Sequence, residues 1–323
     1  MSSEKKLLVI IGATGLQGGA IARTFSTHPL YRVRAITRDP SSAKALALTS
    51  LGIEVVAGNL FDETSLRSAF AGASAIFLVT DGFSGLATGN FDPNQEFLQG
   101  KLAVDVAAEL PALEHFVFSS GPSVKEATAG MYADVLHYEN KAAVTRYLRE
   151  EKGALAHKTT VLWVGGYFQN WTHMPGIFGP VREEGGGWVQ RVPWGREMRL
   201  GMVDVGDLGV VVRAVLERGE QMMGKTVFVV GEESVSQGQM LDDFGKLLNV
   251  PVRFEQIPMD AFYEGLKGSG MPDHFAVAVR DIFQAYNEFG TKLYDAPGLI
   301  LGPGEKLRNW EEYVASADWS WTK

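Results

Sequence analysis

Short apolar segments alternate with segments of helical period from residue 6 to about 164, and this alternation restricts the possible folds most. The apolar segments have the length and composition of buried strands, and the segments between them are long enough for helices that cover a sheet. Such an order is typical of parallel sheets with helices on both faces. We therefore expect an α/β fold with a doubly wound parallel sheet. The predicted strands are 6–11, 31–37, 53–57, 75–79, 115–119 and 159–164, and the predicted crossover helices are 16–26, 41–51, 64–70, 95–110 and 132–152.

The composition restricts the function as well. The 323 residues carry a net charge of −8, which disfavours a broad surface for nucleic acid, and contain no cysteine, which excludes disulfides and thiolate chemistry. No apolar run approaches the roughly 20 residues of a membrane span, and no signal peptide precedes the first apolar segment. We therefore expect no membrane partner and a cytoplasmic location, with the nucleus also open. The six histidines show no metal-binding spacing, so no metal site is predicted.

A glycine-rich loop follows the first predicted strand and opens the first predicted helix. Its sequence, 12–18, has the spacing Gly-x-x-Gly-x-x-Gly. Gly12 permits a tight turn, Gly15 lets the backbone approach a pyrophosphate, and Gly18 lets the helix pack against the strand. The N-terminus of the helix then offers free N–H groups to phosphate. The loop predicts a dinucleotide-binding site, whereas an ordinary strand-to-helix turn is the alternative.

The end of the second predicted strand indicates which dinucleotide is bound. Arg38 has the planar donor group that suits the 2′-phosphate of NADP(H), whereas a solvated surface charge is the alternative reading. Asp39 precedes a proline, so we expect it to turn outward and begin the next helix. NADP(H) is therefore favoured over NAD(H). Asp62, after the third strand, is placed to bind the adenine amine or only to cap a helix.

The second half of the chain predicts a smaller lobe that is interleaved with the sheet domain. Sequence rich in Gly, Pro and Trp after Trp163 indicates loops and a hairpin. An NADP-binding domain of 1–160 plus about 203–232 is therefore expected, with a lobe for substrate or partner of about 161–202 plus 233–323. Helices are predicted at 203–217, 237–248, 259–267, 276–289 and 307–315, and a strand of the main sheet at 225–230.

One sequence match is rejected on its context. Residues 219–226 fit the P-loop pattern, but that pattern requires a strand before the loop and a helix after it. Here a predicted helix precedes the match and a predicted strand follows it, so we expect no nucleoside triphosphate there. The chain also lacks the Gly-x-Ser-x-Gly turn of α/β-hydrolases.

Five segments in order resemble the NmrA-like family, a branch of the atypical short-chain dehydrogenases. They are 12–19, 33–40, 118–121, 137–141 and 167–170, and the resemblance extends from Lys6 to about Trp310. It implies NADP(H) as cofactor, with Arg38 on the 2′-phosphate, Thr80 in the groove and Lys141 near the nicotinamide ribose. The full set of cofactor-binding residues that we expect is Gly12, Ala13, Thr14, Gly15, Leu16, Gln17, Gly18, Arg38, Asp62, Thr80, Lys141, Tyr167, Phe168, Gln169 and Asn170.

The chain departs from the short-chain dehydrogenase pattern one helical turn before Lys141. A tyrosine that donates a proton normally stands there, and here the residue is His137. Tyr138 points about 100° away around the helix. The neighbouring lysine lowers the pKa of the imidazole, so imidazolium is scarce at neutral pH. Lys141, His137 and Ser120 remain the candidate catalytic residues, and Ser120, like Ser119, has the alternative of an ordinary strand-end serine.

Two functions follow from these residues. The missing proton donor and the resemblance to the NADPH-sensor branch favour a redox sensor or regulator that binds a protein partner and has weak or no dehydrogenase activity. The alternative is an NADPH-dependent reductase of an aromatic or quinone-like small molecule that uses Lys141. Aromatic residues of the smaller lobe would line its pocket, unless they form the core of that lobe: Trp171, Phe178, Trp188, Phe262 and Tyr263.

Overall fold

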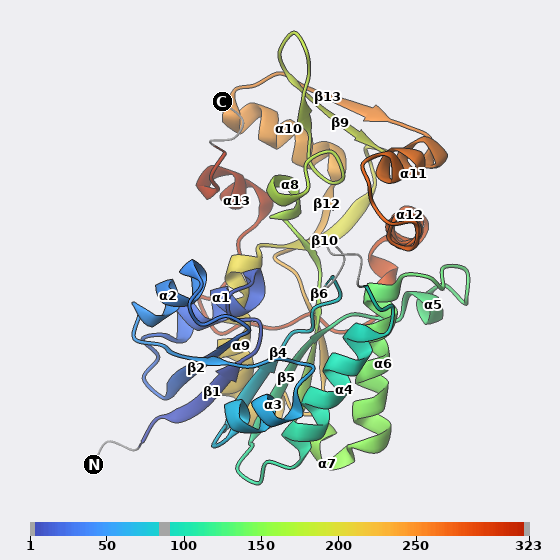
Figure 1. The fold of residues 1–323 in the computed structure, drawn as a ribbon. Coiled ribbons are helices and arrows are strands. Elements are labelled where there is room, and N and C mark those ends of the chain that lie inside the picture. The colour runs from blue at the N-terminus through green and yellow to red at the C-terminus, as the bar shows by residue number, and fades with distance from the viewer. Residues whose placement is uncertain (1–3, 84–90, 320–323) are drawn as a thin grey trace.

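The computed structural model describes residues 4–83 and 91–319, and its largest element is a parallel sheet of seven strands (Figure 1). The strand order is β11-β6-β5-β4-β1-β2-β3, and every neighbouring pair is parallel. This confirms the doubly wound α/β fold, including the return of the 225–230 segment to the main sheet. The strands are β1 (Lys6–Ile10), β2 (Tyr31–Thr37), β3 (Glu54–Ala57), β4 (Ala75–Leu78), β5 (His115–Ser120), β6 (Thr159–Val164) and β11 (Thr226–Val229).

Helices cover both faces of the main sheet because alternate residues of each strand point to opposite sides. On β1, Leu8 and Ile10 belong to a core with Phe25, whereas Leu7 and Val9 belong to the core on the other face. The first core contains residues of α1 (Leu16–Phe25), α2 (Ala43–Thr49) and α9 (Leu208–Arg218). The second contains residues of α3 (Glu63–Phe70), α4 (Gln95–Ala108), α6 (Leu136–Glu151) and α7 (Gly153–Ala156).

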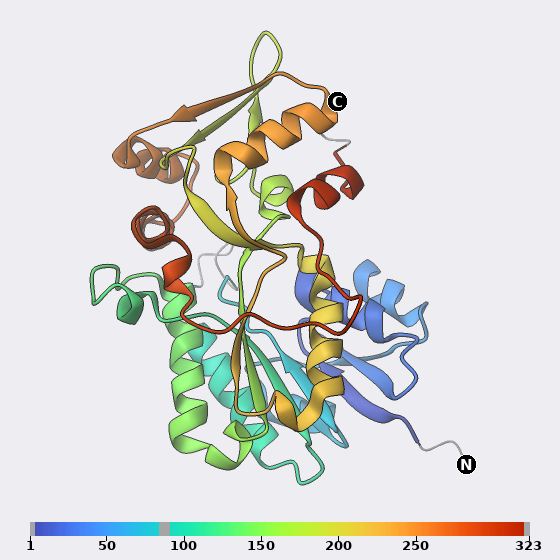
Figure 2. The ribbon, with the colours of Figure 1, turned by 180° about the vertical axis from the view of Figure 1, so that it is seen from behind.

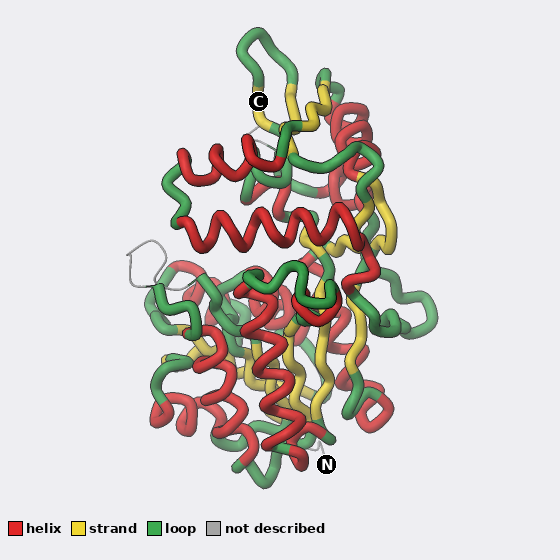
Figure 3. The backbone as a smooth tube through the Cα atoms, turned by 90° about the vertical axis from the view of Figure 1, so that its right-hand side faces the viewer, coloured by secondary structure: helices red, strands yellow, loops and turns green. Residues whose placement is uncertain are grey.

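The smaller lobe contains two three-stranded sheets, β12-β10-β7 and β13-β9-β8, and lies in the upper half of Figure 3. The predicted hairpin is confirmed, since β8 and β9 pair antiparallel around the glycines at 185–187. The other strands of these sheets were not predicted, because they are short and their partners are distant in sequence. The strands are β7 (Gly166–Tyr167), β8 (Val181–Arg182), β9 (Trp188–Val192), β10 (Arg199–Val203), β12 (Glu232–Ser236) and β13 (Val252–Gln256). The remaining helices are α5 (Val124–Ala127), α8 (Asn170–His173), α10 (Gln237–Leu248), α11 (Met259–Gly268), α12 (Asp273–Phe289) and α13 (Trp310–Ser316), with single 3₁₀ turns at Val205–Asp207, Gly219–Gln221 and Gly290–Leu293.

The segment before α13 crosses the back of the molecule and links the two parts (Figure 2). The backbone N–H of Phe228 on β11 donates to Pro297 O at 2.8 Å, and Leu299 N–H donates to Phe228 O at 3.0 Å. Arg308 then forms ion pairs with Asp204 and Asp207, which precede α9. The chain therefore passes repeatedly between the main sheet and the smaller lobe, as expected of interleaved parts. The exact division into two domains stays a prediction.

The strand order reverses beside β1, and the crevice in which this kind of fold binds ligands lies at that point. From β1 the chain proceeds outward to β2 and β3, and then returns to β4 on the other side of β1. Ligands of open α/β sheets bind at the carboxyl ends of the strands at such a point. The two loops are in close contact there, because a Cβ added to Gly12 would lie 2.7 Å from Val79 Cγ1.

Three sequence interpretations are settled by the fold. Helix α6 begins at Leu136, so the start predicted at residue 132 was wrong. The P-loop match at 219–226 has α9 before it and β11 after it, as expected for a chance match. The lobe aromatics belong to the core: Trp171 is 1% exposed, Trp188 and Phe262 are each 5% exposed, and Phe178 and Tyr263 pack against them.

The described ranges, 4–83 and 91–319, contain neither a membrane-spanning helix nor a cluster of metal ligands. No helix there has the length and apolar character needed to cross a membrane. No group of three or more histidine, aspartate or glutamate side chains there is arranged to hold a metal ion.

We expect His115 on β5 to make the fold sensitive to acid. The side chain is 3% exposed, and burial lowers its pKa from about 6.5 to about 4. The unfolded chain binds this proton near pH 6.5 and the folded chain only near pH 4. The stabilisation is therefore complete above pH 6.5 and is lost as the pH falls toward 4, by about 3 kcal/mol in total.

The check is urea unfolding of wild type and His115→Gln between pH 7 and pH 4.5. The glutamine amide retains a donor for Thr160 Oγ1, which His115 Nε2 contacts at 2.8 Å. Between pH 7 and pH 4.5 the free energy of unfolding should fall in both proteins. We expect the fall to be about 2–3 kcal/mol larger in wild type than in the variant. An equal fall in both proteins would contradict the assignment.

Candidate functional site

The glycine loop forms a tight turn between β1 and α1. Gly12 has a φ of +70°, which favours glycine, and its carbonyl accepts from Gly15 N–H at 2.9 Å. A Cβ on Gly18 would lie 2.4 Å from Gly12 O, so only glycine lets α1 approach the loop this closely. No acidic residue stands in the first turn of α1, and no side chain caps it. The N-terminus of α1 is therefore suited to an anion.

A groove of about 430 Å³ runs from this loop along the carboxyl ends of the strands. Its volume lies in the range of small-molecule and cofactor sites. The groove brings together residues from both halves of the sheet and, through Tyr167, from the smaller lobe. The predicted residues that line it are Gly12, Thr14, Gly15, Leu16, Gln17, Arg38, Thr80, Lys141 and Tyr167.

Arg38 extends from the end of β2 and its side chain is 68% exposed, 3.5 Å from a carboxylate oxygen of Asp81. Asp39 instead turns away, as expected: its carboxylate accepts from Ser41 N–H at 2.8 Å and from Ser41 Oγ at 2.5 Å. These bonds lower the pKa of Asp39. The guanidinium, and not the neighbouring carboxylate, therefore lines the groove at this end.

Some predicted residues lie outside the groove. Asp62 caps α3, accepting from Ser65 N–H at 3.2 Å, which agrees with the cap alternative. Phe168 is 0% exposed in the core of the smaller lobe, so the structure does not place its side chain against a cofactor. Gln169 donates to Asp204 Oδ1 at 2.6 Å and Asn170 begins α8. The last two predicted residues outside the lining, Ala13 and Gly18, contribute through the shape of the loop.

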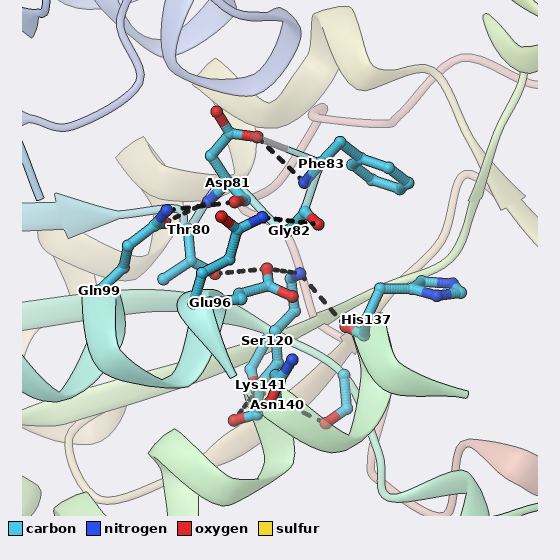
Figure 4. A network of polar contacts seen from close by, with 12 residues as sticks. Thr80, Asp81, Gly82, Phe83, Glu96, Gln99, Ser120, His137, Asn140 and Lys141 are labelled. Carbon is cyan, nitrogen blue, oxygen red and sulfur yellow. Dashed lines mark hydrogen bonds and ion pairs between the residues drawn. The ribbon is translucent and has the colours of Figure 1, made fainter. Parts of the chain in front are cut away.

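Lys141 forms a buried ion pair at the inner end of the groove (Figure 4). Its ammonium donates to Glu96 Oε1 on α4 and, at 3.3 Å, to the carbonyl of His137. Thr80 Oγ1 donates to the same Glu96 oxygen at 2.7 Å. The Glu96 side chain is 1% exposed and that of Lys141 is 19% exposed. The ammonium is thus held in one position, at the edge of the groove, by a carboxylate that sequence reasoning missed.

The other candidate catalytic residues do not supply a proton donor beside Lys141. Burial and the nearby Lys141 lower the pKa of His137 to about 3, so the imidazole is neutral at pH 7. The Tyr138 hydroxyl bonds instead to Tyr286 and Tyr294, at 2.5 and 2.7 Å. Ser120 is 6% exposed, and its hydroxyl contacts Lys141 O at 3.2 Å and Thr145 Oγ1 at 2.9 Å. The Ser120 hydroxyl is thus bonded to its neighbours, as in the alternative of an ordinary strand-end serine, and a catalytic role for it stays a prediction.

Gln17 and Tyr167 also line the groove and are bonded to each other. Gln17 Nε2 donates to the Tyr167 hydroxyl at 2.5 Å, which joins the glycine loop to β7 of the smaller lobe. Burial raises the pKa of Tyr167 to about 12, so the phenol stays protonated at neutral pH. The carbonyl oxygen of Gln17 is buried without a hydrogen-bond partner among the described residues. A ligand with a donor group in this part of the groove would satisfy it.

Several lining residues were not predicted from the sequence. Phe61, which is 51% exposed, follows β3, and Phe83, which is 54% exposed, follows β4. Gln99 on α4 exchanges two hydrogen bonds with the backbone of Asp81, at 2.8 and 3.2 Å, and so holds the loop after β4. These residues lie after strand ends or on α4, and no motif marks them. Only the general rule that the carboxyl ends of strands carry the site could have indicated Phe61, Asp81 and Phe83.

Comparisons with known proteins show the family of this chain. The model of the NmrA-like family matches residues 4–314. The NmrA-like family domain-containing oxidoreductase cpsB of Aspergillus campestris is 31% identical over 286 residues, which cover 84% of this chain and 80% of that protein. The corresponding oxidoreductase lnaB of Aspergillus flavus is 30% identical over 266 residues, covering 80% and 77%.

Solved structures share the fold. The negative transcriptional regulator NmrA in complex with NADP has a TM-score of 0.77 and 21% identity, over 97% of this chain and 95% of that one. An NADPH-dependent quinone oxidoreductase from Escherichia coli, complexed with NADPH, has a TM-score of 0.70 and 20% identity, over 95% and 98%. The glycine loop, the groove and the family match agree, and the chain belongs to the NmrA-like family.

Proposed function

We propose that this protein is an NADPH-dependent oxidoreductase that reduces a small, activated, apolar molecule, and that Lys141 is its principal catalytic residue. The observation that carries the proposal is the buried Glu96–Lys141 pair at the inner end of the dinucleotide groove. Burying two charges is unfavourable unless their geometry is good. A groove that only bound a dinucleotide would not require a carboxylate behind the lysine.

The residues of the groove fit NADP(H). The glycine loop and the N-terminus of α1 would hold the pyrophosphate, and Arg38 would hold the 2′-phosphate. The carbonyl of Gln17, which has no partner in the part of the chain that the structure describes, and the Lys141 ammonium offer one acceptor and one donor within the groove. When bound, NADPH would supply the hydride.

The protein side chains would act on the oxygen of the acceptor. The Lys141 ammonium can stabilise a developing oxyanion and donate a proton, whereas His137 is neutral and Tyr138 is bonded elsewhere. A single ammonium without the usual tyrosine suits acceptors that take hydride readily, such as quinones and conjugated carbonyl compounds. We expect simple aldehydes and ketones to react negligibly. The names of the two Aspergillus relatives, both oxidoreductases, support this class of reaction.

The second candidate is a redox sensor that reports NADP(H) binding to a protein partner in the cytoplasm or nucleus. The position of Tyr138 favours it, because the hydroxyl of that tyrosine lies among Tyr286 and Tyr294 and not beside Lys141. The fold shared with the transcriptional regulator NmrA is compatible with it. The net charge of −8 disfavours direct contact with nucleic acid in either case.

The two candidates differ in turnover. Wild type saturated with NADPH is incubated with a panel of quinones, conjugated ketones and simple ketones, and both NADPH oxidation and deuterium transfer from cofactor labelled at the hydride position are measured. Gly15→Val protein serves as the control for reaction in solution. Catalytic label transfer to a quinone or conjugated ketone is expected. No transfer to any compound, together with tight NADPH binding, would favour the sensor.

Arg38 is expected to set the preference for NADPH over NADH. An arginine contact to a phosphate contributes about 1.5–3 kcal/mol, so Arg38→Ala should raise the Kd for NADPH roughly tenfold to a hundredfold. The Kd for NADH should change by less than about threefold. Calorimetric titration of both cofactors tests this, with Arg32→Ala on the same strand as control, because Arg32 pairs with Glu54 outside the groove. Equal affinity of wild type for the two cofactors would overturn the assignment.

A further inference from the structure

A small cavity lies beside the groove, between α4, α6 and α12. Gly82 lines both the cavity and the groove, and the wall of the cavity also contains Glu96 on α4, His137 on α6 and Phe275 on α12. Its volume of about 10 Å³ is that of one water-sized group. None of the residues from α12 lines the dinucleotide groove. The cavity is therefore an extension of the site toward the smaller lobe.

Two buried polar atoms of residues that line this cavity have no hydrogen-bond partner within 4–83 and 91–319. One is Glu96 Oε2, since Thr80 and Lys141 both bind the other oxygen of that carboxylate. The second is His137 Nδ1. Buried polar atoms are almost always paired, and an unpaired one is destabilising. Glu96 Oε2 in particular faces Gly82, because a Cβ added there would lie 2.6 Å from it.

The walls around these atoms are aromatic. The Phe91 ring stacks on His274 at 4.5 Å, and the Phe275 ring lies 5.6 Å from Phe91. Phe83 connects the cavity to the groove: its ring is 5.1 Å from that of Phe275, and it is 54% exposed. Figure 4 shows Phe83 and His137 on the same side of the Glu96–Lys141 pair. A flat ring can therefore stack beside Phe83 and direct one substituent toward Glu96.

We infer that Glu96 selects the substrate: its free oxygen, Oε2, accepts a hydrogen bond from a hydroxyl or N–H group on a planar aromatic or conjugated molecule. The size of the cavity admits that donor group and leaves the ring at Phe83. The inference rests on the proposed function, because it places the reacting end of the substrate at Lys141. One carboxylate thus has two roles, holding the catalytic ammonium with Oε1 and recognising the substrate with Oε2.

Binding of a matched pair of probes tests the inference without turnover. Protein saturated with NADP⁺ is titrated with phenol and with anisole, which differ only in the hydrogen-bond donor that would reach Glu96 Oε2. We expect wild type to bind the hydroxyl compound at least tenfold more tightly, as a hydrogen bond to a charged group implies. In Glu96→Gln the amide oxygen can still accept from Lys141 while its NH₂ replaces Oε2. The affinities of this variant for the two probes should then differ by less than twofold, or the methoxy compound should bind more tightly.

Two controls accompany the titrations. Asp105→Asn makes the same change on α4, at a carboxylate that pairs with Lys101 and Lys152 outside both cavities, and should retain the preference. Gly82→Ala places a methyl group against Oε2 without removing the carboxylate. It should weaken the binding of the hydroxyl compound at least fivefold. It also replaces Glu96→Gln as the test if that variant does not fold.

The outcomes separate this inference from the proposed function. Equal binding of the two probes to wild type would overturn it. A larger loss of NADP⁺ affinity than of probe preference in Glu96→Gln would also overturn it, because Oε2 would then serve the cofactor. If the preference follows Glu96 but no compound is reduced, substrate selection by Glu96 stands as ligand recognition and the proposed oxidoreductase fails.

Discussion

Replacing Gly15 with valine is expected to abolish the stabilisation of the protein by NADPH. Gly15 precedes the first turn of α1 and lines the groove, so a branched side chain there would occupy the space of the pyrophosphate. At a ligand concentration of 100 times Kd, wild type should gain about 2.7 kcal/mol, and the variant should gain nothing. Thermal unfolding with and without NADPH measures the difference directly.

The fold itself should tolerate this change. A Cβ on Gly15 lies 3.2 Å from Gly12 O, so a small shift of the loop accommodates it, whereas a Cβ on Gly18 lies 2.4 Å from the same oxygen. We therefore expect Gly18→Val, but not Gly15→Val, to destabilise the unliganded protein strongly. Gly265→Val on α11, where a Cβ meets open space, is the matched control and should keep the response to NADPH. A Gly15→Val protein that NADPH still stabilises fully would show that the loop does not hold the cofactor.

The central strands of the main sheet were predictable because they are buried on both faces, whereas β3 at the edge has no buried residue and was predicted from its apolar composition. A fully buried strand reads as a continuous apolar run, as in β1 and β4, and each run lies within one residue of its observed strand. The small sheets lack this signal. In β13, for example, no residue is fully buried, and the strand pairs with β9 some 60 residues earlier, as in Val252 opposite Trp188.

The site was predictable only where backbone geometry demands particular residues. The positive φ of Gly12 and the close approach at Gly18 restrict those positions to glycine, so the loop is visible in the sequence. Glu96 carries no such mark. It stands in the first turn of α4, where acidic residues are common because they interact favourably with the helix dipole. Only the packing of α4 against α6 brings its side chain to Lys141. A local pattern cannot show that tertiary contact.

This contact also changes the balance between the two functions inferred from the sequence. The sequence favours a sensor because it has no tyrosine four residues before Lys141 that could donate a proton to a substrate. The structure adds a buried carboxylate that fixes the ammonium at the groove, together with an aromatic cavity beside it. A positioned cation of this kind is useful in a transition state and unnecessary for binding alone.

Removing the Lys141 ammonium is therefore expected to eliminate most of the catalysis and little of the cofactor affinity. Positioned acid catalysis contributes about 10²–10⁴-fold, so kcat/KM of Lys141→Ala toward the best acceptor should fall by about that factor. Its Kd for NADPH should rise less than about tenfold, since the glycine loop and Arg38 are intact.

Stability provides the check that this loss is chemical and not a consequence of unfolding. Lys141→Ala leaves Glu96, whose side chain is 1% exposed, without its cation, and such an orphaned charge destabilises a fold by about 3–5 kcal/mol. In the double variant Lys141→Ala with Glu96→Gln the buried charge is gone, so most of that stability should return while activity stays low. Urea unfolding and turnover are measured for wild type, the two single variants and the double variant, which together form a double-mutant cycle. If the double variant regains stability and activity together, Lys141 supports the fold and does not act on the substrate.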